Sequence, residues 1–196
     1  STTIFLYVMV FATCSFLVNK MRSHLFVALF AAIAFVGVHA LEQWTVSRQK
    51  KIIIYNTPKY KAIDFIYHDQ YVFCGDSLLT RDGFLRNFHL KPARISLQVH
   101  EISSNMPGLF FQPHAISYCG RKLILIDTTI HFQPRDEKVK ADILLLSKNA
   151  NIRIEELLTA LRPSRVVIDA SNSLWKIAKW KKECLALALP CFSIPE

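Results

Sequence analysis

Two long runs without charged residues constrain this chain more than any other feature of its sequence. Residues 1–19 and residues 23–41 contain no Asp, Glu, Lys or Arg, and each run is long enough to cross a bilayer core as a helix. Lys20 and Arg22 lie between the runs, which predicts a tight turn between antiparallel helices. A pair of core helices in a soluble protein is the alternative, but adjacent uncharged runs are rare outside membranes. The sequence therefore predicts two transmembrane helices in residues 1–47.

Basic residues on either side of the second run bear on the orientation of this hairpin. The positive-inside rule places the Lys20–Arg22 turn in the cytoplasm, which puts the C-terminal part of the chain outside it. Arg48, Lys50 and Lys51 favour the opposite orientation. A short turn with two charges is difficult to move across a membrane, so we expect an extracytoplasmic C-terminal part, with Trp44 as an interfacial anchor.

Residues 48–196 are long enough to form one domain with its own core. All 15 acidic residues follow residue 41, as do all but two of the 24 Lys and Arg, so residues 42–196 carry a formal charge of about +7. A basic surface attracts nucleic acid or anionic lipid headgroups, although a soluble basic domain without such a partner has the same charge. No glycine follows Gly120, which excludes a Gly-rich phosphate-binding loop in the C-terminal half and the nucleotide-driven motors that use one.

A strand–helix–strand pattern organises the C-terminal part. Residues 143–146 form an apolar run typical of a strand buried on both faces. Residues 152–161 then repeat apolar side chains at helical spacing, and residues 166–168 are a second short buried strand. Crossovers of this kind join parallel strands. Polar residues that follow the strands are expected at one edge of the sheet, where chemistry gathers in such folds.

Apolar periodicity predicts the remaining elements. Strands are expected at residues 52–55, 62–67, 71–74, 94–100, 109–111, 122–126 and 191–194. Helices are expected around residues 81–88 and over residues 174–188, and residues 128–140 are expected to be a loop. We expect Asn149 or Asn151 to cap the helix at 152–161, and Pro163 to end it. The predicted fold class is α+β, with an antiparallel strand-rich half before an α/β half.

Short motifs in a particular order give the chain a resemblance to a known family. In chain order, they are Tyr55–Pro58, Ala62–Phe65, Gly75–Ser77, Phe88–Pro92, Leu144–Asn149 and Val167–Lys176. Following two apolar runs, they resemble the C-terminal part of a ComEC-type competence protein of the kind found in Bacteroidetes-like bacteria. Proteins of that family form the inner-membrane channel that takes one strand of incoming DNA into the cytoplasm. Many carry a C-terminal metallo-β-lactamase-like domain, proposed to degrade the other strand.

This resemblance implies a domain organisation, a location and partners. Residues 1–47 would be the last two transmembrane helices of the competence membrane domain, and residues 48–196 a degenerate metallo-β-lactamase-like α/β sandwich. The protein would be a multi-pass component of the bacterial plasma (inner) membrane. Its partners would be the lipid bilayer, single- or double-stranded DNA, the upstream part of the same channel protein and other competence proteins.

The chain departs from that family at the residues that would hold metal ions. A working metallo-β-lactamase fold has a His-x-His-x-Asp-His cluster directly after a buried strand, and the matching position here is Ser147–Ile152. Ser, Lys and Asn are poor ligands for zinc. All seven histidines lie at or before His131, and four of them show no ligand spacing: His89, His100, His114 and His131. We therefore expect no catalytic residue, no metal site and no cofactor.

Polar residues at the predicted strand ends are candidates for a vestigial site edge. They are Asp76, Ser77, Asp127, Ser147, Asn149, Asp169, Ser171 and Asn172. Asp76 and Asp127 would equally serve as turn residues. Capping of the following helix is the simpler interpretation of the last three residues of the set.

A basic and aromatic segment near the C-terminus is the candidate DNA contact. Its residues are Trp175, Lys176, Lys179 and Lys182, and such a face could bind phosphates and stack bases of single-stranded DNA. The alternative is a core tryptophan beside a solvated row of lysines.

Three functions fit the sequence. The first is a component of an inner-membrane DNA-uptake channel whose C-terminal domain is non-catalytic and supports or contacts DNA. The second is a membrane-anchored, metal-dependent nuclease or hydrolase, and the third is a membrane-anchored interaction module. The missing ligands favour the first over the second.

Overall fold

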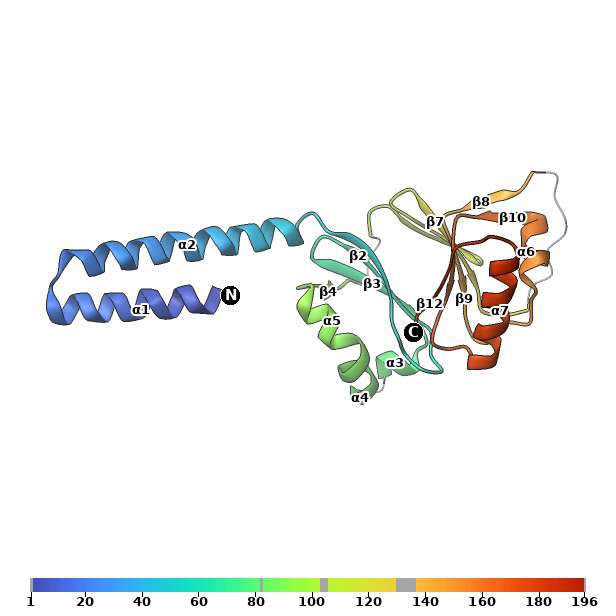
Figure 1. Cartoon of the computed structure of the whole chain (residues 1–196), viewed down its shortest axis with the longest axis horizontal. Coiled ribbons are helices and arrows are strands. Elements are labelled where there is room, and N and C mark those ends of the chain that lie inside the picture. Colours follow the sequence, from blue (N-terminus) through green and yellow to red (C-terminus); the bar gives the residue numbers. More distant parts are fainter. Residues whose placement is uncertain (1, 82, 103–105, 130–136, 196) are drawn as a thin grey trace. The chain divides into compact units, whose positions relative to one another are not determined.

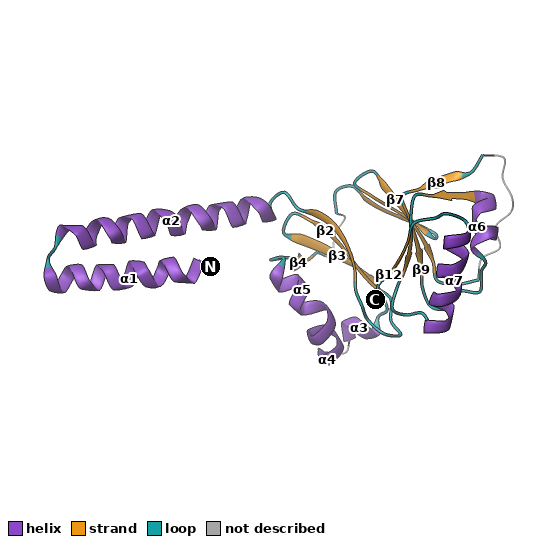
Figure 2. Ribbon diagram, in the orientation of Figure 1, coloured by secondary structure: helices purple, strands orange, loops and turns teal. Residues whose placement is uncertain are grey.

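The computed structural model describes residues 2–81, 83–102, 106–129 and 137–195. The chain divides into two units, residues 1–49 and residues 50–196. Figures 1 and 2 show a helical first unit and a mixed second unit of helices and strands, so the α+β fold class is confirmed.

The first unit is a helical hairpin. Helix α1 (Thr2–Asn19) and helix α2 (Arg22–Val46) lie antiparallel, and the turn between them places Lys20 in the left-handed region with φ 52°. The buried residues Ala12 and Ala31 are small, which allows two helices to approach closely. Of the described residues, one helix, α2, is long and apolar enough to cross a membrane, and the apolar helix before it is shorter.

A six-stranded sheet forms the centre of the second unit. Its strands, in spatial order, are β12 (Cys191–Ser193), β11 (Val166–Ile168), β9 (Ile143–Leu146), β7 (Arg121–Ile126), β6 (Ala115–Tyr118) and β5 (Leu109–Gln112). The first four run parallel, and β6 and β5 continue the sheet antiparallel. The predicted pair of parallel strands, β9 and β11, is confirmed.

Two smaller sheets complete the strands. A four-stranded sheet contains, in order, β1 (Lys50–Ile54), β2 (Ala62–Tyr67), β3 (Gln70–Gly75) and β4 (His100–Glu101). The first three are antiparallel, and β4 is parallel to β3. A separate parallel pair consists of β8 (Val139–Ala141) and β10 (Leu161–Pro163).

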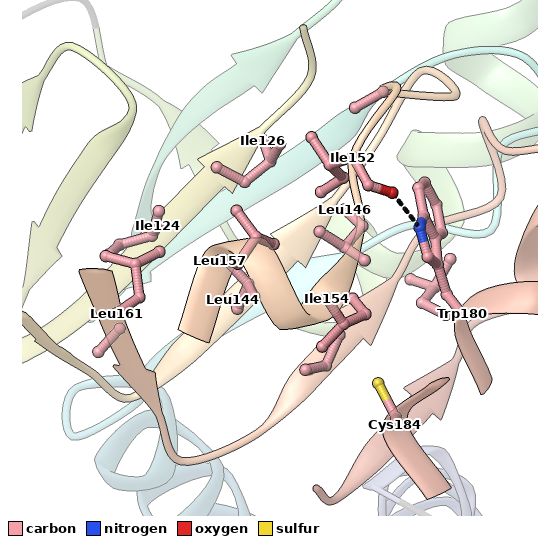
Figure 3. Packing of buried hydrophobic residues seen from close by; sticks show 14 of the residues in the cluster. Ile124, Ile126, Leu144, Leu146, Ile152, Ile154, Leu157, Leu161, Trp180 and Cys184 are labelled. Carbon is pink, nitrogen blue, oxygen red and sulfur yellow. Dashed lines mark hydrogen bonds between the residues drawn. The ribbon is translucent and has the colours of Figure 1, made fainter. Parts of the chain in front are cut away.

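The second unit is built in four layers. Successive residues of a strand face opposite sides of its sheet, so the two faces of the six-stranded sheet pack against different layers. On β9, Leu144 and Leu146 pack in the cluster that includes helices α6 (Ile154–Ala160) and α7 (Leu174–Ala186), whereas Leu145 packs in the cluster shared with the four-stranded sheet. Figure 3 shows the first cluster, where the indole of the buried Trp180 donates a hydrogen bond to the carbonyl of Ile152 at 3.3 Å.

Short helices form the fourth layer, on the outer face of the four-stranded sheet. They are α3 (Leu78–Arg81), α4 (Gly83–Leu85), the π-helical segment η1 (Arg86–Leu90) and α5 (Lys91–Ser96). Leu79 and Leu90 of this layer pack in a third cluster against Tyr55 and Ala62. The order of layers is therefore helices, sheet, sheet, helices.

Some predicted elements are wrong. The strand expected at residues 94–100 is not formed: residues 94–96 end helix α5, a turn follows, and only His100 belongs to a strand, β4. Pro92 favours the first turn of a helix, and tertiary contacts bury Arg94. Helix α6 ends at Ala160, before Pro163, and residues 161–163 form strand β10.

The loop expected at residues 128–140 includes the first two residues of strand β8, and residues 130–136 of it lie outside the described part of the chain. Neither Asn149 nor Asn151 caps helix α6. Arg153 holds the N-cap position without a side-chain bond, and the carboxylate of Glu183 accepts the N–H of Ile154 at 3.0 Å.

Candidate functional site

The carboxyl ends of β9 and β11 bring Ser147 and Asp169 together. Both side chains follow directly after a buried strand, and parallel neighbours end at the same edge of a sheet. The hydroxyl of Ser147 donates to Asp169 Oδ2 at 2.5 Å, and both residues are buried. This pair is the centre of what we call the strand-end network, formed by Ser147, Asp169, Ser171 and Asn172.

Asp169 accepts most of the hydrogen bonds of the strand-end network. Its Oδ1 atom accepts from the amide of Ser171 at 3.1 Å, the Ser171 hydroxyl at 2.5 Å and Nδ2 of Asn172 at 2.9 Å. Burial raises the pKa of Asp169, against the opposing effect of these donors and of the Lys61 charge. The network's polar groups satisfy one another inside the protein.

The turn after β9 has an unusual backbone. Lys148 and Asn149 are both left-handed, with φ 53° and 54°, a conformation that costs free energy for residues other than glycine. Two hydrogen bonds offset this cost. The Lys148 amide donates to the Ser171 hydroxyl at 2.7 Å, and the Asn149 amide donates to Oδ1 of Asn172 at 2.8 Å. The strand-end network therefore holds the turn that carries Lys148.

Two lysines hold the carboxylates of Asp76 and Asp127. We call these four residues, Lys61, Lys148, Asp76 and Asp127, the lysine–carboxylate cluster. The ammonium group of Lys148 donates to Asp76 Oδ1, the Lys61 amide donates to Asp76 Oδ2 at 2.9 Å, and the Lys61 ammonium donates to Asp127 Oδ2 at 2.7 Å. Lys61 and Asp76 flank strands of the four-stranded sheet, whereas Asp127 and Lys148 follow strands of the six-stranded sheet. The cluster thus joins the two sheets at one end.

The lysines determine the charge state of Asp76. Partial burial acts to raise its pKa, but the hydrogen bonds from Lys148 and from the Lys61 amide, with the charges of both lysines, outweigh burial and hold the pKa below its ordinary value. Asp76 is therefore ionised and forms an ion pair with Lys148, so its role is larger than the turn role suggested by its sequence.

Seven of the eight predicted edge residues lie in one connected set of hydrogen bonds, and Ser77 does not. Ser77 is exposed at the start of α3, where its carbonyl accepts the amides of Thr80 and Arg81. The capping role suggested for Asp169, Ser171 and Asn172 is wrong. Ser173 is the N-cap residue of α7 and its side chain makes no cap bond. Asn149 instead accepts the amide and hydroxyl of Ser173 at 2.8 and 2.9 Å.

Sequence reasoning missed Lys61. Its one local signal is its position directly before the buried strand β2. Its carboxylate partner, Asp127, lies 66 residues further along the chain. Only the packing of the two sheets brings this pair together.

The residues predicted to contact DNA have two different environments. Trp175, Lys179 and Lys182 are exposed on α7. Lys176 is buried, and its ammonium group donates to the carbonyl of Asn149 at 2.5 Å and lies 5.5 Å from the ring centre of Trp180. Lys176 therefore ties α7 to the turn after β9.

The site's donor set can be compared with what a metal pair requires. Within the described ranges, no three His, Cys, Asp or Glu side chains lie where they could hold a metal ion. At the turn after β9 the side chains are hydroxyl, ammonium and amide groups, which do not fit a zinc pair. His131 lies outside the described residues, and His100 is exposed, with Nδ1 3.7 Å from an Asp69 carboxylate oxygen.

Comparison with known proteins gives one match. The family model described as the ComEC C-terminal domain matches residues 52–196. No curated protein and no solved structure matches the chain.

Proposed function

Because the chain belongs to the family of the ComEC C-terminal domain, and so takes part in DNA uptake during competence, we propose that it is the end of an inner-membrane DNA channel. In this proposal the second unit contacts and supports the DNA without cleaving it. The upstream part of the same channel protein and other competence proteins are its partners.

The lysine–carboxylate cluster is the observation that carries the non-catalytic role. A metal-dependent hydrolase needs carboxylates and imidazoles that converge on an open position for the ion and its water. Here Asp76 and Asp127 are each held by a lysine ammonium group, so two fixed positive charges stand beside the carboxylates. These two ammonium groups repel a divalent metal ion from the carboxylates of Asp76 and Asp127.

The layers of the second unit support a degenerate metallo-β-lactamase-like sandwich over residues 48–196. Two sheets packed face to face with helices outside them, and polar residues gathered where the strands end, are the features that such a domain would share. On this proposal Asp76, Asp127, Ser147, Asn149, Asp169, Ser171 and Asn172 are the remains of the site edge.

The helical hairpin supports a membrane anchor in residues 1–47. Large apolar side chains such as Phe11, Phe30 and Val36 are exposed on its helices, as lipid-facing residues are in a bilayer. Both helices cross the inner membrane in this proposal. The Lys20–Arg22 turn is cytoplasmic and the second unit extracytoplasmic, because positive turns stay in the cytoplasm.

Purified full chain in nanodiscs tests the proposal by three measurements on one preparation: metal content, nuclease activity with and without a chelator, and DNA binding over a range of salt. We expect salt-dependent DNA binding, no cleavage, and zinc and manganese well below one equivalent. Stoichiometric metal with chelator-sensitive cleavage supports the hydrolase instead. Absence of DNA binding supports an interaction module.

A further inference from the structure

A basic pocket lies at the end of the parallel strands opposite to the lysine–carboxylate cluster. Its volume is about 470 Å³, and its lining includes Lys122, Lys140, Asp142 and Arg162. These residues stand at the start of β7, in β8, before β9 and in β10. None of them takes part in the site described above.

The single carboxylate of this pocket is already neutralised. Asp142 Oδ1 accepts from the guanidinium of Arg121 at 2.9 Å, and Oδ2 accepts from the backbone amide of Lys122 at 2.8 Å. Among the residues that the structure describes, the side-chain cations of Lys122, Lys140 and Arg162 have no acidic partner, and all three side chains are exposed. The pocket therefore presents three cations to solvent.

Lys140 and Arg162 are also placed against one another. They are direct partners in the parallel ladder of β8 and β10, and like charges directly opposite each other destabilise a sheet. Residues whose local interactions destabilise the fold are characteristic of a functional site. A bound anion would relieve this repulsion.

An exposed aromatic ring lies on the same face of the six-stranded sheet as Lys122. Phe110 on the edge strand β5 pairs with Ser117, which pairs with Lys122 on β7. Directly paired residues share a face, and neighbouring strands are about 4.8 Å apart, so the backbones of Phe110 and Lys122 are about 10 Å apart. The Phe110 side chain is 66% exposed.

We propose that Phe110, Lys122, Lys140 and Arg162 form a site for single-stranded DNA, which we call the basic–aromatic site. This inference rests on the proposed function. The three cations bind phosphodiester groups, and Phe110 stacks on an unpaired base, as in other single-strand-binding surfaces. A lipid headgroup offers a phosphate but no base to stack. The exposed face of α7 has less uncompensated positive charge, because the ammonium group of Lys179 lies 3.8 Å from a carboxylate oxygen of Glu183.

Fluorescence anisotropy of a labelled oligothymidine on the full chain in nanodiscs of zwitterionic lipid tests this site. The variant K122Q/K140Q/R162Q is expected to bind at least about tenfold more weakly, with a salt slope smaller by about 2, since each single-strand phosphate contact contributes about 0.7. F110L is expected to lose about fivefold or more with an unchanged slope, because it removes stacking and no charge.

Matched controls separate this site from the remaining basic surface. K179Q/K182Q/R153Q removes three exposed cations elsewhere on the unit, and F192L replaces an exposed phenylalanine on the opposite edge strand β12. Both controls are expected to bind like the unmodified chain. Circular dichroism checks folding, and the single variant K140Q replaces the triple variant where the latter does not fold.

Each result that differs from these expectations contradicts a specific part of the proposal. Normal binding by the triple variant, with loss in K179Q/K182Q/R153Q, moves the contact to the surface that carries these three residues and leaves the proposed function intact. Failure of the unmodified chain to bind DNA contradicts the proposed function itself. Equal binding of duplex with no effect of F110L contradicts single-strand recognition. Displacement of the oligonucleotide by phosphatidylglycerol vesicles, again with no effect of F110L, identifies a site for lipid phosphate.

Discussion

Arg94 holds Asp64 through two parallel hydrogen bonds inside the second unit. Its Nε atom donates to Oδ2 at 2.8 Å and its Nη2 atom donates to Oδ1 at 2.9 Å. Asp64 is completely buried on β2, where the hydroxyl of Tyr55 also donates to it at 2.6 Å, and the guanidinium lies 4.0 Å from the ring centre of Tyr71. This pair fixes α5 against the four-stranded sheet.

Replacing Arg94 with Met is expected to lower the free energy of unfolding by about 3–5 kcal/mol. The variant keeps an apolar stem but leaves the Asp64 carboxylate as an uncompensated buried charge. Urea unfolding of the full chain, followed by tryptophan fluorescence, measures the change. The double variant R94M/D64L removes both charges and is expected to recover much of the loss. A single variant as stable as the unmodified chain would show that the pair contributes little.

Arg94 also shows where sequence reasoning failed and why. Ile95, Leu97 and Val99 alternate as in a half-exposed strand, but α5 extends to Ser96 and a turn follows it, and burial of Arg94 against Asp64 holds this helix in place. The strands β9 and β11 were predictable because all of their information is local: short apolar runs flanked by polar residues. Local pattern therefore determines the central strands, whereas a non-local ion pair determines α5.

The candidate site was predictable in part for the same reason. Ser147 and Asp169 follow buried strands, so the parallel topology alone places them at one edge. The pairing of Lys61 with Asp127 and of Lys148 with Asp76 depends on how two sheets pack, which periodicity does not contain. Likewise the group that satisfies the first amide of α6 comes from Glu183, 29 residues away.

Asp169 is expected to make stability fall as the pH rises above about 4. Burial raises its pKa in the folded chain above the ordinary 3.8, so between the two values the folded state binds more protons than the unfolded state, and unfolding becomes easier with rising pH. The variant D169N cannot ionise and lacks this decline. Urea unfolding at a series of pH values compares the two chains. Parallel curves for D169N and the unmodified chain would contradict the role of Asp169.

Lys148 is expected to support stability in the opposite pH range. The pKa of Asp76 is lowered from 3.8 in the folded chain, so its pair with Lys148 stabilises fully above that value and is lost as the pH falls through the folded pKa. K148Q is expected to cost about 1 kcal/mol at neutral pH, since the pair is partly exposed, and nothing once Asp76 is protonated. K182Q, which removes an exposed lysine of α7, serves as the control. A penalty that is the same at acidic and neutral pH would assign Lys148 a role independent of Asp76.

Lys140→Glu separates the two consequences of the facing cations in β8 and β10. The new carboxylate lies opposite Arg162 in the ladder, so repulsion becomes attraction and the free energy of unfolding is expected to rise by about 0.2–1 kcal/mol. The same change removes one phosphate-binding cation and adds an anion, so the affinity for oligothymidine is expected to fall more than in K140Q. Stability and binding therefore change in opposite directions, which a purely structural role of Lys140 does not produce. Urea unfolding and fluorescence anisotropy on the same samples measure both quantities. If the variant loses both stability and affinity, Lys140 serves the fold and does not bind the ligand.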